Sequence, residues 1–146
     1  MRAVVRFYRV GDEYGCFSNF APYPIELDDA RWPTSEHYFQ AQKFADAAQR
    51  ERIRCVASPM IAARMGRSRR HPLRPDWEDA KDTIMRAAVR AKFTQHADIR
   101  QVLLATGDAE IIEHAQNDAY WGDGGDGSGR NMLGRILMEI RGKLRG

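Results

Sequence analysis

An acid, an amide and an amine recur at helical spacing in the segment that follows Thr34. Glu36, Gln40, Lys43 and Ala47 fall within a narrow sector of a helix that turns by about 100° per residue. Helical side chains lean toward the N-terminus, so the amine of Lys43 is brought back toward the carboxylate of Glu36. The spacing predicts that these side chains line one wall of a cleft and converge on a small ligand. A solvated polar stripe would have the same spacing.

A glycine-rich segment, residues 117–131, carries a second set of candidate ligand-binding groups. Its glycines, Gly122 among them, let the backbone come close to a ligand or adopt positive φ. Trp121 could stack on a base or instead close over the core, and Asp123 could contact ribose hydroxyls or a water molecule. Asn131 is a natural N-cap for the closing helix, whose first N–H groups would welcome phosphate. About fifteen residues without regular structure favour a binding loop over a mere connection.

Two further segments hold residues suited to binding. Phe17-Ser18-Asn19-Phe20 places an amide between two aromatic rings, a mixture suited to a heterocycle, while structural use of both phenylalanines is the alternative. A basic run could bind phosphate or could form an exposed loop. That run consists of Arg64, Arg67, Arg69, Arg70, His71 and Arg74.

The spacing of acids and histidines does not predict a metal site. Asp118, Asp123 and Asp126 resemble part of a calcium loop, but residues 128–134 lack the glutamate that would close it. His37 has no second histidine, cysteine or aspartate at metal-ligand spacing, so we interpret it as a first-turn or core-edge residue of its helix. Neither a metal nor another cofactor is expected.

Capping residues and hydrophobic periodicity predict the elements that position these groups. Thr34 or Ser35 caps a helix whose apolar face continues to Ala48. Asp28-Asp29 is a plausible two-residue hairpin turn. The predicted strands are 3–8, 25–27, 30–32 and 111–114, and the remaining predicted helices are 59–66, 77–91, 99–105 and 132–144. For 111–114 a helix is the alternative, and its short, β-branched run favours the strand. The fold class is therefore α+β and predominantly α-helical.

Length and composition indicate one ordinary globular domain over residues 1–146, with 43% hydrophobic and 29% charged residues. The sequence has no apolar run long enough to span a bilayer and no signal peptide, so we expect a cytoplasmic protein. Cys16 and Cys55 lack zinc-ligand spacing and are expected to be buried thiols. The net charge of +3 suits an anionic ligand, and only four of the 23 basic residues are lysines, which makes each lysine worth explaining.

Several motifs together resemble the NADAR family, and the resemblance covers nearly the whole chain. The segments 58–60 and 62–67 are also similar to a bacterial branch of that family. The motifs are Phe17-Ser18-Asn19-Phe20, Trp32-Pro33-Thr34-Ser35-Glu36-His37-Tyr38-Phe39-Gln40-Ala41-Gln42-Lys43-Phe44, Asn117-Asp118-Ala119-Tyr120-Trp121-Gly122-Asp123-Gly124, Gly129, Asn131, Leu133 and Gly134.

The resemblance implies an N-glycosidase that releases ribose 5-phosphate from the phosphoribosylamino-pyrimidine intermediates of riboflavin biosynthesis. It implies a small-molecule substrate, no metal, and no membrane partner. Other branches of the family remove ADP-ribose from guanine, so nucleic acid is a partner only under that alternative. The candidate catalytic residues are Glu36, Lys43 and Asp123, and the candidate substrate-binding residues are Phe17, Ser18, Asn19, Gln40, Arg64, Trp121, Gly122 and Asn131.

Overall fold

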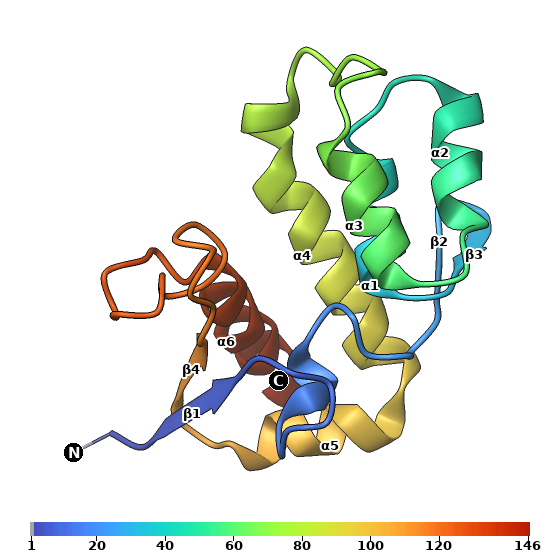
Figure 1. The fold of residues 1–146 in the computed structure, drawn as a ribbon. Coiled ribbons are helices and arrows are strands. Elements are labelled where there is room, and N and C mark those ends of the chain that lie inside the picture. Colours follow the sequence, from blue (N-terminus) through green and yellow to red (C-terminus); the bar gives the residue numbers. More distant parts are fainter. Residues whose placement is uncertain (1) are drawn as a thin grey trace. The chain divides into compact units, whose positions relative to one another are not determined.

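The computed structural model describes residues 2–146 and confirms an α+β, predominantly helical fold (Figure 1). Contacts divide the chain into two units, which we call the terminal unit (residues up to Ala21, with Phe93–Gly146) and the central unit (Pro22–Lys92). The prediction of one domain over residues 1–146 stays a prediction. Within residues 2–146, no helix is both long and apolar enough to cross a membrane. The elements are β1 (Val4–Phe7), the 3-10 turn η1 (Gly15–Phe17), β2 (Ile25–Leu27), β3 (Ala30–Trp32), α1 (Ser35–Ala41), α2 (Ala47–Arg54), α3 (Pro59–Arg67), α4 (Trp77–Gln95), α5 (Ala97–Ala105), β4 (Glu110–Glu113) and α6 (Met132–Arg145).

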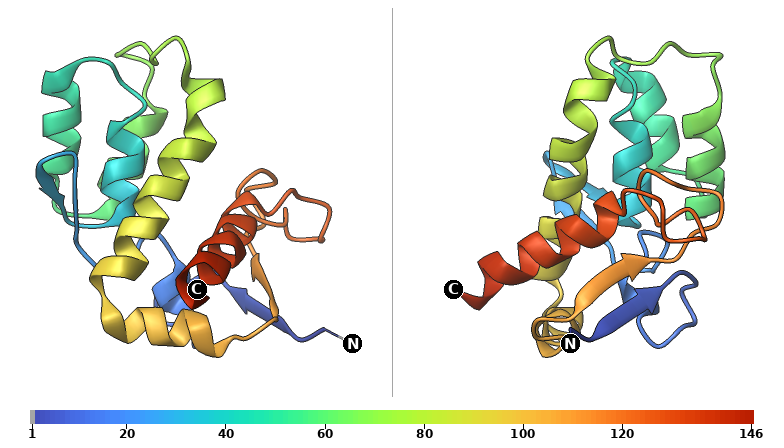
Figure 2. Two further views of the ribbon diagram at one scale, coloured as in Figure 1. Left: turned by 180° about the vertical axis from the view of Figure 1, so that it is seen from behind. Right: turned by 90° about the vertical axis from the view of Figure 1, so that its left-hand side faces the viewer.

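The terminal unit is built on two parallel strands. β1 pairs with β4 so that Val5 lies opposite Ile111, and both side chains are buried. Helix α6 packs against β4 and α5 packs against α6, an arrangement visible in Figures 1 and 2. Both predicted strands and the closing helix are confirmed, because alternation along β1 and the apolar stripe of α6 each bury one face.

Asn131 occupies the N-cap position of α6, as predicted, but its side chain does not cap the helix. Its backbone is left-handed (φ 53°) and its side chain makes no capping hydrogen bond. Instead Nδ2 donates to the carbonyl of Ile111 at 2.9 Å, and Oδ1 accepts from the N–H of Glu113 at 2.9 Å. The amide thus replaces a neighbouring strand along β4 and joins the glycine-rich segment to the sheet.

We therefore expect Asn131→Ala to destabilise the protein by about 2–3 kcal/mol, because it leaves two backbone groups of β4 unpaired. Asn131→Gly loses the same bonds but relieves the left-handed backbone, so it should cost ~1 kcal/mol less. Urea unfolding followed by tryptophan fluorescence measures both. Equal stability of the alanine variant and the wild type would show that this amide does not support the fold.

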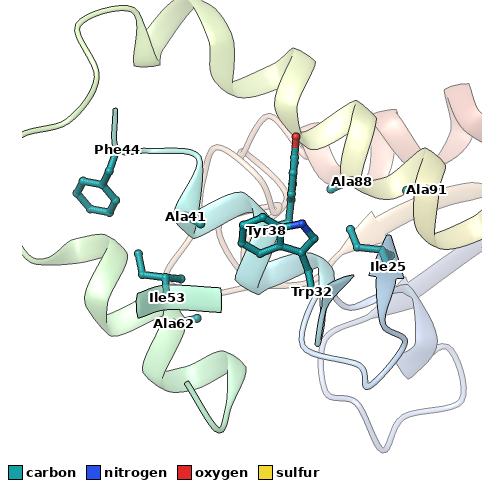
Figure 3. Packing of buried hydrophobic residues seen from close by; sticks show 9 residues of the cluster. All are labelled: Ile25, Trp32, Tyr38, Ala41, Phe44, Ile53, Ala62, Ala88 and Ala91. Atoms are coloured by element: carbon teal, nitrogen blue, oxygen red, sulfur yellow. The ribbon is translucent and has the colours of Figure 1, made fainter. Parts of the chain in front are cut away.

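The central unit begins with the predicted hairpin, which is confirmed. β2 and β3 pair antiparallel across Asp28 and Asp29, whose φ values of 55° and 60° match a type I′ turn. Tyr38 of α1 donates its hydroxyl hydrogen to Oδ2 of Asp28 at 2.8 Å, which ties the hairpin to the helix. The hairpin and helices α1 to α4 surround one apolar cluster, drawn in Figure 3: Ile25, Trp32, Tyr38, Ala41, Phe44, Ile53, Ala62, Ala88 and Ala91.

The predicted long helix after Thr34 is two helices. α1 ends at Ala41, and Asp46 caps a new helix by accepting from the N–H of Ala48 at 2.9 Å. Residues 42–46 form a tight connection between them, so Lys43 belongs to a turn and Ala47 starts α2. The continued apolar period of Phe44, Ala45 and Ala48 concealed this break.

Candidate active site

The first turn of α1 fixes the position of Glu36. Thr34 Oγ1 accepts from the backbone N–H of His37 at 3.1 Å, which confirms the predicted cap. Glu36 is buried, with 9% of its surface exposed, and lies in the first turn of α1, where the helix dipole favours a negative charge.

His37 is a structural residue, as predicted. It is fully buried, its Nδ1 lies 2.8 Å from Thr34 Oγ1, and its Nε2 lies 3.1 Å from the carbonyl oxygen of Val56. Burial lowers the pKa of His37, and the bond to Val56 only partly opposes this. The ring thus joins α1 to the segment after α2.

Gln40 points at Glu36, one helical turn earlier. Its Nε2 donates to Glu36 Oε2 at 2.7 Å, and its Oε1 is buried without a hydrogen-bond partner. The two side chains therefore lie together, as the spacing predicted, and their place in the wall of a cleft stays a prediction. The substrate contact predicted for Gln40 stays a prediction.

Lys43 lies just beyond α1, in an aromatic setting. Its Nζ is 5.8 Å from the ring centre of Phe39 and 5.9 Å from that of Trp77 at the start of α4. Burial lowers the pKa of Lys43, the Glu36 carboxylate opposes this, and the positive charges of Arg69 and Arg67 add to the lowering. Compared with an exposed lysine, more of this amine is neutral and able to act as a nucleophile near neutral pH.

Only some arginines of the basic run act on the charge of Lys43. Arg69 donates to the carbonyl of Gly66 at 2.9 Å, and its charge acts on Lys43. Arg64, the predicted substrate-binding residue, is exposed on α3 and does not contribute to the pKa shift of Lys43. Its role stays a prediction.

Asp123, the second predicted carboxylate, belongs to the terminal unit. It is buried, with Oδ2 2.8 Å from Nδ1 of His114 and Oδ1 accepting from the N–H of Gly125 at 2.8 Å. Burial raises the pKa of Asp123, but these hydrogen bonds outweigh it and the net shift is downward. Asp123 is thus held ionised. No spacing in the sequence predicts His114 as its partner.

The start of α6 does not offer the phosphate site expected from the sequence. The N–H groups of Met132 and Leu133 are bonded to the carbonyls of Tyr120 and Trp121 at 3.0 Å. Gly122 is needed by the loop itself, because a Cβ there would lie 2.8 Å from the Cβ of Ala115. These N–H groups bond to carbonyls of the same segment and are not free for a phosphate, so the prediction of a phosphate site at the helix end is wrong.

The remaining predicted residues divide into core and partly exposed groups. Phe17 is 1% exposed and packs edge-on against Phe7 and Phe93, with ring centres 5.8 and 5.9 Å apart, so the structural alternative holds. Ser18 and Asn19 are also buried, whereas Trp121 is partly exposed and lies edge-on to Tyr120. The stacking role of Trp121 stays a prediction. Cys16 is partly buried, but Cys55 is exposed, contrary to expectation.

Comparison with known proteins places this geometry in a family. The model of the NADAR domain matches residues 6–145. N-glycosidase YbiA of Escherichia coli (strain K12) is 60% identical over 97% of this chain and 88% of its own length. Riboflavin biosynthesis protein VVA0006 of Vibrio vulnificus (strain YJ016) is 44% identical over 99% of this chain and 39% of its own. The NMR structure of E. coli YbiA matches with a TM-score of 0.92 and 59% identity, covering 99% of this chain and 87% of that one.

Proposed function

We propose, since this chain belongs to the NADAR family and is a hydrolase of N-glycosyl bonds, that it cleaves the ribose C1′–N bond of phosphoribosylamino-pyrimidines. These are the early intermediates of riboflavin biosynthesis, and the products would be ribose 5-phosphate and the pyrimidine base. The observation that carries the proposal is the pair Lys43 and Glu36. Burial lowers the pKa of the Lys43 amine, and the buried carboxylate of Glu36 is close enough for its charge to act on that amine. A cytoplasmic location is part of the same proposal.

Glu36 suits the charge that develops in this reaction. When a ribosyl C1′–N bond breaks, positive charge builds up at C1′, as an oxocarbenium-like or iminium centre. A carboxylate fixed in a dry site stabilises that charge more strongly than water does, because it needs no reorganisation. Glu36 is buried and held by Gln40, which are the properties this role requires. Asp123 stays a predicted second carboxylate.

Lys43 suits a covalent route through the ring-opened sugar, in which C1′ and the pyrimidine amine form an imine. The neutral Nζ of Lys43 attacks C1′ and forms a new C–N bond. The pyrimidine amine takes up a proton and leaves with the electrons of the old bond, so that an imine joins C1′ to Lys43. Water then adds to C1′, and ribose 5-phosphate leaves as the free amine is restored.

The assay that tests the proposal offers the purified protein two substrates in parallel, with a metal chelator present. One is the phosphoribosylamino-pyrimidine and the other is an oligonucleotide carrying ADP-ribosylated guanine. Release of ribose 5-phosphate from the first alone supports the proposal. Turnover of neither substrate contradicts it.

Removal of ADP-ribose from guanine in nucleic acid is the second candidate function. The observation that favours it is the group of exposed arginines on α3 and just after it: Arg64, Arg67, Arg69 and Arg70. If these side chains track a phosphate backbone, activity on the oligonucleotide should fall steeply as salt rises. Cleavage of the small substrate would respond much less.

The lowered pKa of Lys43 predicts a specific pH dependence. Turnover through the neutral amine should increase as pH rises through that pKa. Arg69→Gln and Arg67→Gln each remove a positive charge that lowers the pKa of Lys43, so each should move the midpoint of the rise to higher pH. The measurement is kcat/KM against pH. Arg31→Gln, on the exposed hairpin edge, is the control and should leave the midpoint in place.

A further inference from the structure

Gln40 is held in an unusual way for a buried amide. Only 7% of its surface is exposed, its Nε2 donates to Glu36 at 2.7 Å, and its Oε1 has no hydrogen-bond partner. An unsatisfied buried oxygen destabilises a fold, and an apolar side chain of the same length would avoid that cost. We therefore infer that the hydrogen bond from Nε2 to Glu36 is kept although the unsatisfied Oε1 destabilises the fold.

Gly66 of α3 provides the space in which this amide lies. A Cβ at residue 66 would be 1.8 Å from Gln40 Oε1 and 2.7 Å from Gln40 Cδ, distances that no real side chain could keep. Gly66 is buried, and α3 packs directly on α1. Glycine at this position is required by the position of Gln40, and the sequence pattern had suggested only a helix stop.

The orientation of the amide depends on the charge of Glu36. With Nε2 toward the carboxylate, an N–H donates to a negatively charged oxygen, which is among the stronger hydrogen bonds in proteins. The reverse orientation would set Gln40 Oε1 against Glu36 Oε2, two acceptors at hydrogen-bond distance. The observed arrangement favours the ionised carboxylate and holds it in one direction.

We propose that Gln40 is a positioning residue for Glu36. The absence of a side chain at Gly66 leaves the space that the Gln40 amide needs for this role. This inference rests on the proposed function, in which the Glu36 carboxylate faces the positive charge at C1′. Gln40 itself touches no reacting atom. It acts by keeping Glu36 charged and correctly directed, in place of the substrate contact that its sequence position suggested.

Gln40→Met tests the amide, because methionine keeps the length and packing of glutamine but cannot donate. We expect kcat to fall about tenfold, the usual size of a lost hydrogen bond to a charged group, with KM little changed. The acid limb of the pH–rate profile should move to higher pH, since Glu36 loses a donor to its charged form. Gln40→Glu, which sets a second carboxyl beside Glu36, should move it in the same direction. Gln49→Met, at a buried glutamine of α2 that accepts from Arg52, is the matched control and should change neither quantity.

A double-mutant cycle tests whether Gly66 acts through Gln40. Gly66→Ala should displace the Gln40 amide and lower kcat about as much as Gln40→Met does. In a Gln40→Ala background the two closest clashes, with Oε1 and Cδ of residue 40, are gone and only its Cβ remains, 3.2 Å from the new methyl group, so the same substitution should then change kcat much less. Equal losses of kcat in both backgrounds would show that Gly66 serves helix packing alone. That result would overturn its role in making space for the Gln40 amide.

Titration of the Glu36 carboxyl by ¹³C NMR separates failure of this inference from failure of the proposed function. The Glu36 resonance is assigned by its disappearance in Glu36→Gln, and the measurement needs no substrate. If the wild type has no glycosidase activity, the proposed function fails, yet a higher titration midpoint in Gln40→Met or Gln40→Glu still supports the positioning role. An active wild type with unchanged midpoints and rates in both variants would overturn the positioning role and leave the proposed function standing.

Discussion

Replacing Lys43 by methionine should lower kcat by a factor on the order of a thousand or more, because the proposed route loses its nucleophile. Methionine keeps the unbranched stem that packs near Phe39 and Trp77, so the fold should survive. Lys43→Arg keeps the positive charge but cannot form an imine, and it should be equally inactive. The measurement is single-turnover release of ribose 5-phosphate, with the unfolding temperature as the check on folding.

Trapping during turnover examines the covalent step itself. Borohydride added while the pyrimidine substrate is being consumed should reduce the imine and leave a ribose-phosphate adduct on Lys43, located by peptide mass. Lys143→Met is the matched control, since Lys143 is exposed and pairs with Glu139 on α6, and it should retain normal rates and trapping. An unmodified Lys43 after complete turnover, together with an active Lys43→Arg, would assign the lysine a purely electrostatic role.

Local signals in the sequence were enough to predict most elements. The Asp28-Asp29 turn, the Thr34 cap and the apolar stripe of α6 each depend on a few neighbouring residues, and each is confirmed. Their physical basis is short-ranged, in backbone conformation, unpaired N–H groups and the burial of one helical face.

The errors arose where one local signal hid another. Asp46 is a good N-cap, but the apolar spacing across it fitted one continuous helix, so Lys43 was placed on a helical stripe when it lies in a turn. Asn131 likewise has the residue type of a cap, and nothing nearby in sequence indicated that β4 would take both ends of its amide. A local cap decided the first case, and tertiary contacts overrode local preference in the second.

The chemistry of the site depends on contacts that the sequence does not display. The lowered pKa of Lys43 comes from burial and then from the charges of Arg69 and Arg67, which belong to another part of the chain. The lowered pKa of Asp123 likewise depends on the hydrogen bond from His114. The sequence pattern predicts Gly66 only as a helix terminator, whereas the structure shows that a side chain there would clash with Gln40. Residue types identified the candidate groups, whereas their protonation and direction follow from the fold.

Glu36→Gln should lower kcat by a factor on the order of a hundred or more while leaving the fold nearly intact. The substitution removes the charge that faces C1′ but keeps the size of the side chain. Its Oε1 can still accept from Gln40 Nε2, so the contact between the two residues need not be lost. The effect should therefore appear in kcat, measured with saturating substrate, and hardly at all in the unfolding temperature.

The matched control for this experiment is Glu51→Gln on α2. Glu51 is an exposed carboxylate paired with Arg54, and its removal should leave turnover unchanged because surface ion pairs contribute little. A Glu36→Gln protein that fails to fold would make Glu36 a structural residue of the first turn of α1. A folded variant with near-normal turnover would remove Glu36 from the mechanism and transfer its proposed role to Asp123, which its hydrogen bonds already hold in the ionised form.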